Sequence, residues 1–118
     1  MNWALVNERV LGVFGPVLIL TGIAGFLIPH RFALMSGAPA YNIFHIVSGV
    51  IGTALVLAKR STGVATFNLG FGIADLYQAV AGVAGFFPAR AFRYKPADHV
   101  LHVVLGLALA AVGWMGLR

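Results

Sequence analysis

The stretch VLGVFGPVLILTGIAGFLI, residues 10–28, decides the fold because it runs for 19 residues without a charged side chain. A helix of this length extends about 28 Å at about 1.5 Å per residue, which is close to the thickness of the hydrocarbon core of a bilayer. Backbone polar groups in hydrocarbon must pair within their own segment, and the stretch lacks the alternating polarity of a strand. It therefore predicts a membrane-spanning helix.

Three more apolar stretches follow, and only the one that contains Asp75 carries a charged residue. Short connections between helices favour antiparallel neighbours and therefore a bundle. The predicted fold class is all-α, an integral membrane four-helix bundle in which residues 1–118 form a single domain. The predicted spans are residues 10–28, 40–58, 64–87 and 99–117.

The composition agrees with a membrane location. Of the 118 residues, 60% are hydrophobic and 9% charged, and the mean hydropathy is +0.93. A soluble domain of this size could not bury so much apolar surface. The net charge of +5 comes from basic residues beside the apolar stretches, where they meet lipid headgroups, so we expect the lipid bilayer and no nucleic acid as a partner. The first residues do not resemble a cleavable signal, so we expect the whole chain to stay in the membrane.

Two pairs of segments resemble each other and indicate an internal repeat. GIAGFLIP at 22–29 resembles GVAGFFP at 82–88, and the pattern H-x-x-x-G occurs at His45 and again at His102. The offsets are 60 and 57 residues. We expect two copies of a two-helix hairpin, related by an axis along the membrane normal, with the two histidines at equivalent places.

The histidines admit three interpretations. In the first, His45 and His102 are axial ligands of a tetrapyrrole, either one haem between the two helices or separate haem or chlorophyll-type rings. The glycine one turn after each histidine would leave room for a flat ring, and Asp98 would accept the other N–H of His102. The residues predicted for such a site are His45, His102, Gly49, Gly106, Asp98 and Asn42.

The second interpretation is a metal site formed by His99, His102 and His45, because the first two share a helix face. The absence of cysteine excludes thiolate ligands, and Asp98 is the one carboxylate nearby. In the third interpretation these residues are structural. Asp98 then caps the fourth helix, and Asn42 and the histidines bond across helices or to loop carbonyls.

Asp75 lies near the middle of the third stretch, where no Lys or Arg shares its depth. A charge there is expensive unless it is paired. We expect a neutral carboxyl that is hydrogen-bonded to Thr21 or Gln78, and the alternative is a place on a proton or ion path. These three residues are the predicted intramembrane polar set.

The motifs at His45 and His102 resemble a family of small bacterial four-span membrane proteins known as domain of unknown function 4383. Its members carry N-x-x-H-x-x-x-G in the second helix, here Asn42 to Gly49, and D-x-x-x-H-x-x-x-G in the fourth, here Asp98 to Gly106. Members often have a histidine before the Asn, where this chain has Tyr41. The resemblance covers residues 10–117 and implies a bacterial membrane protein, without implying a reaction.

No catalytic constellation is visible, so we expect the protein not to be an enzyme. The expected function is that of an accessory or scaffold subunit that binds other membrane protein subunits, with the tetrapyrrole as a further possibility. The alternative is a stand-alone b-type haem-binding electron carrier. The expected location is the bacterial inner (cytoplasmic) membrane, with several spans.

Overall fold

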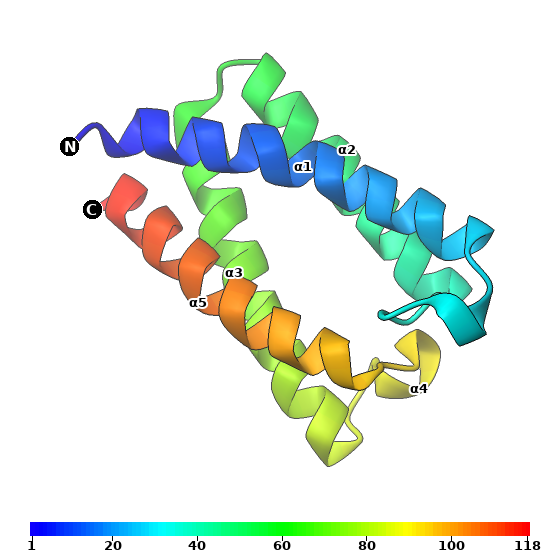
Figure 1. Cartoon of the computed structure of the whole chain (residues 1–118). Helices are drawn as coiled ribbons and strands as arrows, with labels where there is room; N and C mark the ends of the chain where they lie inside the picture. Colours follow the sequence, from blue (N-terminus) through cyan, green and yellow to red (C-terminus); the bar gives the residue numbers. More distant parts are fainter.

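The computed structural model describes all 118 residues and is 82% helical, with no strands. Four long helices are packed compactly and are joined by short connections (Figure 1). The elements in chain order are α1 (Trp3–Leu27), the 3-10 helix η1 (His30–Phe32), α2 (Pro39–Leu57), α3 (Ser61–Ala84), the short helix α4 (Ala89–Phe92) and α5 (Pro96–Leu117). The prediction of an all-α fold with four long helices is confirmed.

The helix ends differ from the predicted ones for local reasons. The first helix begins at Trp3 rather than at residue 10, because the Asn2 side chain accepts a hydrogen bond from the backbone N–H of Leu5 and caps it. The third helix ends at Ala84 rather than at residue 87, because Gly85 adopts a left-handed conformation with φ of 78°. Hydropathy marks the apolar part of a helix and misses such capped ends.

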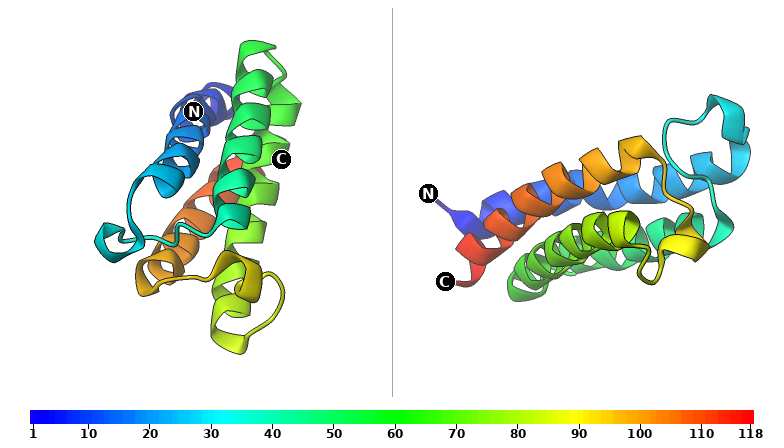
Figure 2. Two further views of the ribbon diagram at one scale, coloured as in Figure 1. Left: turned by 90° about the vertical axis from the view of Figure 1, so that its right-hand side faces the viewer. Right: turned by 90° about the horizontal axis from the view of Figure 1, so that it is seen from below.

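The long helices pack in two hairpins, α1 against α2 and α3 against α5. Both termini and the α2–α3 connection lie at one end of the bundle, and η1 and α4 lie at the other (Figures 1 and 2). Three helices are long and apolar enough to cross a membrane, namely α1, α2 and α5. The helix α3 is less apolar.

Glycines let the two helices of each hairpin approach closely. A Cβ atom added at Gly15 of α1 would lie 3.3 Å from the carbonyl oxygen of Gly49 in α2. The same contact recurs in the other hairpin, where a Cβ atom at Gly72 would lie 2.8 Å from the carbonyl oxygen of Gly106. Each residue of the second pair lies 57 positions after its counterpart in the first. The two hairpins are therefore joined at equivalent points.

The interior is more polar than that of a typical domain. The buried side chains include nine polar or charged ones against eight hydrophobic ones, and glycines make up the rest of the buried residues. Large hydrophobic side chains are exposed on all four long helices, among them Val13, Val47, Ile73 and Leu107. Many of the large apolar side chains of this chain therefore face outward.

Two glycines in α3 provide a matched test of this packing. Gly72 faces α5 closely, whereas Gly70 has no atom within 4 Å of the position of an added Cβ. We expect Gly72→Ala to lower the free energy of unfolding by about 1–3 kcal/mol or more, because the backbones must separate. Gly70→Ala should leave it unchanged or raise it by up to about 1 kcal/mol, because alanine favours the helix. Unfolding of the purified protein by SDS titration measures both, and equal effects would contradict this packing.

Candidate functional site: a polar cavity between the hairpins

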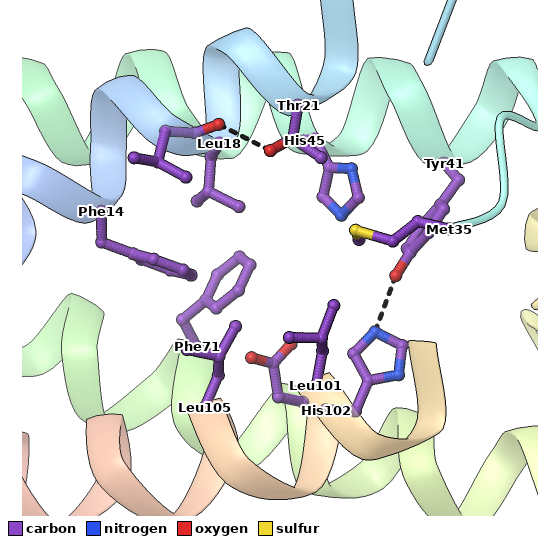
Figure 3. Close-up of a pocket in the computed structure, with 12 residues that line it drawn as sticks. Phe14, Leu18, Thr21, Met35, Tyr41, His45, Phe71, Leu101, His102 and Leu105 are labelled. Atoms are coloured by element: carbon purple, nitrogen blue, oxygen red, sulfur yellow. Dashed lines mark hydrogen bonds between the residues drawn. The ribbon is translucent and has the colours of Figure 1, made fainter. Parts of the chain in front are cut away.

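A cavity of about 150 Å³ lies between the two hairpins. Its polar lining residues are Thr21, Tyr41, His45, Asp75 and His102, and the remaining walls are aromatic and aliphatic. His45 from α2 and His102 from α5 face it from opposite sides, as Figure 3 shows. Two elements from each hairpin thus contribute the groups that converge on one space.

The cavity lies where equivalent positions of the two hairpins meet. Phe14 and Phe71 are 57 positions apart, and their rings contact edge to face with centroids 5.5 Å apart. His45 and His102 are separated by the same 57 positions. Tyr41 and Asp98 are also 57 positions apart, and the Tyr41 hydroxyl donates to Asp98 Oδ1 at 3.0 Å. Two of these equivalent pairs therefore touch across the hairpin interface, and the two histidines face each other across the cavity.

Asp98 connects three parts of the chain beside the cavity. Its side chain is fully buried, and its Oδ2 accepts hydrogen bonds from the backbone N–H groups of Lys95 and Ser36, both at 2.8 Å. The bond from Lys95 caps α5, as the structural interpretation of the sequence predicts. The bond from Ser36 reaches the loop of the other hairpin. With the Tyr41 hydroxyl, the carboxylate has three donors and is well satisfied.

Tyr41 also determines the arrangement of His102. Its oxygen lies 2.9 Å from His102 Nε2 (Figure 3). A carboxylate only accepts hydrogen bonds, so Tyr41 donates to Asp98 and accepts from the Nε2–H of His102. The Nδ1 atom of His102 is then the unprotonated one, and it is buried without a partner. The prediction that Asp98 bonds His102 directly is wrong, because Tyr41 stands between them.

The loops of the two hairpins are fastened together at the same end of the bundle. Lys95 Nζ donates to the carbonyl oxygens of His30 and Ala33, both at 2.6 Å. The hydroxyl of Ser36 donates to the carbonyl oxygen of Phe92 and accepts from the N–H of Ala38 at 3.2 Å. The loop that contains η1 and the loop that contains α4 therefore close the bundle as one layer.

Asp75 has one hydrogen-bonding neighbour, the amide of Gln78, whose Nε2 donates to Oδ1 at 3.3 Å. Gln78 Oε1 in turn accepts from the Tyr94 hydroxyl at 2.8 Å. Burial raises the pKa of Tyr94, which extends the alkaline range over which this hydroxyl remains a donor. Of the two hydrogen-bonding partners predicted for Asp75, Gln78 forms the bond. The other, Thr21, lines the same cavity but donates to the carbonyl oxygen of Val17 in its own helix.

Asn42 also has a structural place. Its Nδ2 donates to the carbonyl oxygen of Gly37 at 2.8 Å, which is the loop contact that the sequence predicts. Its side chain packs directly on Gly25 of α1, and 57 positions later the ring of His99 packs on Gly82 of α3 in the same way. Both side chains therefore fasten the two helices of their own hairpin and lie outside the cavity.

The opposite end of the bundle holds a polar cluster that the sequence interpretation missed. Asn7 Nδ2 donates to the carbonyl oxygens of Trp3 and Val112, at 2.8 and 2.9 Å, and its Oδ1 accepts from Asn68 Nδ2 at 2.9 Å. Both asparagines are fully buried, and they join α1, α3 and α5. An asparagine inside an apolar helical pattern is the signal that would have found Asn68. Asn7 lies outside the apolar stretch and carries no such signal.

A tetrapyrrole held between His45 and His102 does not fit these residues. The predicted ring space at Gly49 and Gly106 is filled by neighbouring helices, since added Cβ atoms would lie 2.8 Å from the backbone nitrogen of Ile19 and from Leu76 Cγ, respectively. A cavity of about 150 Å³ takes up a single ring such as benzene, which is far smaller than a four-ring macrocycle. These glycines serve helix packing instead.

The predicted metal ligands His99, His102 and His45 do not form a site. No three His, Asp or Glu side chains come together in a way that could hold a metal ion. His99 packs against Gly82 and the ring of Tyr94, with ring centroids 5.9 Å apart, while His102 Nε2 is occupied by Tyr41. The i, i+3 spacing gave two histidines on one helix, and both rings pack against Tyr94, but neither meets His45 in a ligand set.

Comparisons with known proteins give no further guidance, because no family model, curated protein or solved structure matches the chain. The resemblance at His45 and His102 therefore stays a prediction.

The Asp98 contacts generate a direct test. We expect Asp98→Asn to lower the free energy of unfolding by about 1–3 kcal/mol for each buried N–H left without an acceptor, because the amide NH₂ replaces a carboxylate oxygen. Glu8→Gln is the matched control, because Glu8 pairs with Lys59 at 3.1 Å on the surface and should contribute about 1 kcal/mol or less. SDS unfolding of the two variants compares them. An effect of Asp98→Asn no larger than that of Glu8→Gln would contradict the assigned role of Asp98.

Proposed function

We propose that the protein is a multi-pass integral membrane protein in which all four long helices cross the bilayer. The observation that carries this proposal is the reversed distribution of polarity. Half or more of each side chain is exposed at Val13, Val47, Ile73 and Leu107, one on each long helix, while the buried set is rich in polar groups. Water would disfavour such a surface, whereas lipid matches it.

The helix α3 is the fourth span in this proposal, although it is less apolar than the other three. Its polar residues Asn68, Asp75 and Gln78 are all buried against the other helices. Its outward face carries Ile73 and Val80, both exposed. The 24 residues of α3 extend about 36 Å at about 1.5 Å per residue, which is enough to cross the hydrocarbon core. Its low mean hydropathy reflects its inner face.

The role we propose is that of a non-enzymatic accessory or scaffold subunit in a larger membrane assembly. Gly70 supports it, because this glycine lies within α3, is exposed and has no neighbour within 4 Å. A glycine without a packing contact weakens a helix by about 1 kcal/mol relative to alanine. Thr66 precedes it by four residues on the same outward face, and this spacing of small residues allows a helix of another subunit to approach closely.

We place the protein in the bacterial inner membrane, with the lipid bilayer and other membrane protein subunits as its partners. The bacterial origin depends on the resemblance of the motifs at His45 and His102, and the membrane location depends on the exposed apolar surface. The basic residues Lys59 and Arg60 are exposed at the end that carries both termini, where they suit contact with lipid headgroups.

The size of the protein after gentle detergent extraction tests the accessory role. We expect the wild type to stay with membranes until detergent is added and then to elute in a complex larger than one chain in a micelle. Gly70→Leu should elute as a single chain, because the added side chain points outward and keeps the other helix away. Ala108→Leu, an exposed small residue on α5, is the matched control and should keep the complex. Identical single-chain elution of the wild type and both variants would contradict the proposal.

A further inference from the structure

We infer that the cavity between the hairpins binds a small membrane-soluble molecule that carries one aromatic or quinone-type ring with a hydroxyl or carbonyl oxygen. The inference depends on the proposed membrane location only for the route by which such a molecule arrives. The size of the cavity, its walls and its unpaired polar groups carry it.

The dimensions of the cavity suit one ring. Cavities of about 150 Å³ in proteins take up benzene, and this cavity has the same volume. The rings of Phe14 and Phe71 form part of its wall at the hairpin interface. Aromatic rings pack favourably against one another edge to face or offset, so these side chains suit a flat ligand.

The polar groups that face the cavity have unused hydrogen-bonding capacity. His45 is 5% exposed and makes no hydrogen bond to the rest of the chain, in contrast to its counterpart His102. Asp75 is 3% exposed, and its one bond, from Gln78, is long at 3.3 Å. Buried polar groups are expensive unless they are paired. An oxygen on the ligand ring would supply a hydrogen-bond partner to these side chains.

The cavity also reaches the outer surface of the bundle. Val17 of α1 lines it and is 47% exposed, and Leu101 and Leu105 of α5 form the wall beside it. The helices α1 and α5 belong to different hairpins and contact each other much less than α3 and α5 do. A molecule dissolved in the bilayer would therefore enter the cavity directly from the lipid, between α1 and α5, without passing through water.

Phenol and toluene are suitable probes because they have nearly the same shape and differ in one hydroxyl. Each is titrated into the full-length protein in detergent while the imidazole signals of ¹⁵N-histidine are followed by NMR. We expect phenol to shift the His45 signals saturably and to bind at least about tenfold more tightly than toluene, because only phenol pairs the buried groups. Equal affinities would overturn the polar part of the inference, and no saturable shift would overturn the site.

Two variants locate the binding. Leu105→Phe places a ring inside the cavity and should abolish the phenol shift, and Leu101→Phe provides the same test if the first variant does not fold. Val104→Phe is the matched control, because this neighbouring side chain is exposed on α5 and should leave binding unchanged. Asp75→Asn should fold and weaken phenol binding. Retained binding in Leu105→Phe and Leu101→Phe would overturn the assignment. These readouts do not depend on the size of the complex that tests the accessory role.

Discussion

The hydrogen bonds of one buried carboxylate hold the two hairpins in register. Asp98 accepts one bond from the cap of its own helix, one from the loop of the other hairpin and one from Tyr41 of α2. Asp98 is fully buried, so its replacement leaves these donors without their acceptor inside the protein. The positions of His102, of the two loops and of the cavity follow from this arrangement.

The polarity of the bundle follows from the same constraint. Hydrophobic side chains gain nothing by meeting inside a bilayer, because the lipid chains are equally apolar. Association of the helices then depends on close backbone contact, which Gly15, Gly49, Gly72 and Gly106 provide, and on buried hydrogen bonds. The Asn7–Asn68 cluster supplies such bonds at one end and Asp98 supplies them at the other. The cavity lies where the hairpins are separated between these two points.

The sequence predicted the four helices, though not all of their ends, because long apolar stretches are a local signal. The cap formed by Asp98 and the loop bond of Asn42 were also predicted from local signals. The space expected beside Gly49 and Gly106 was wrong, because a glycine pattern does not tell whether a ring or a neighbouring helix fills the gap. The central place of Tyr41 was missed, since its contacts arise only when residues 57 positions apart meet. The offset of 57 that relates His45 to His102 also relates Tyr41 to Asp98, and it holds for the first and third helices, where the sequence comparison used 60.

The absence of cysteine in the chain allows a direct measurement of what surrounds the helices. Single cysteines replace Val13, Val47, Ile73 and Leu107, and the protein is placed in liposomes that are permeabilised so that a water-soluble maleimide reaches both faces. We expect that none of the four reacts until detergent and SDS are added, whereas a cysteine at Arg60 reacts at once. Rapid labelling at Ile73, on the least apolar helix, would contradict the proposal that all four helices are surrounded by lipid.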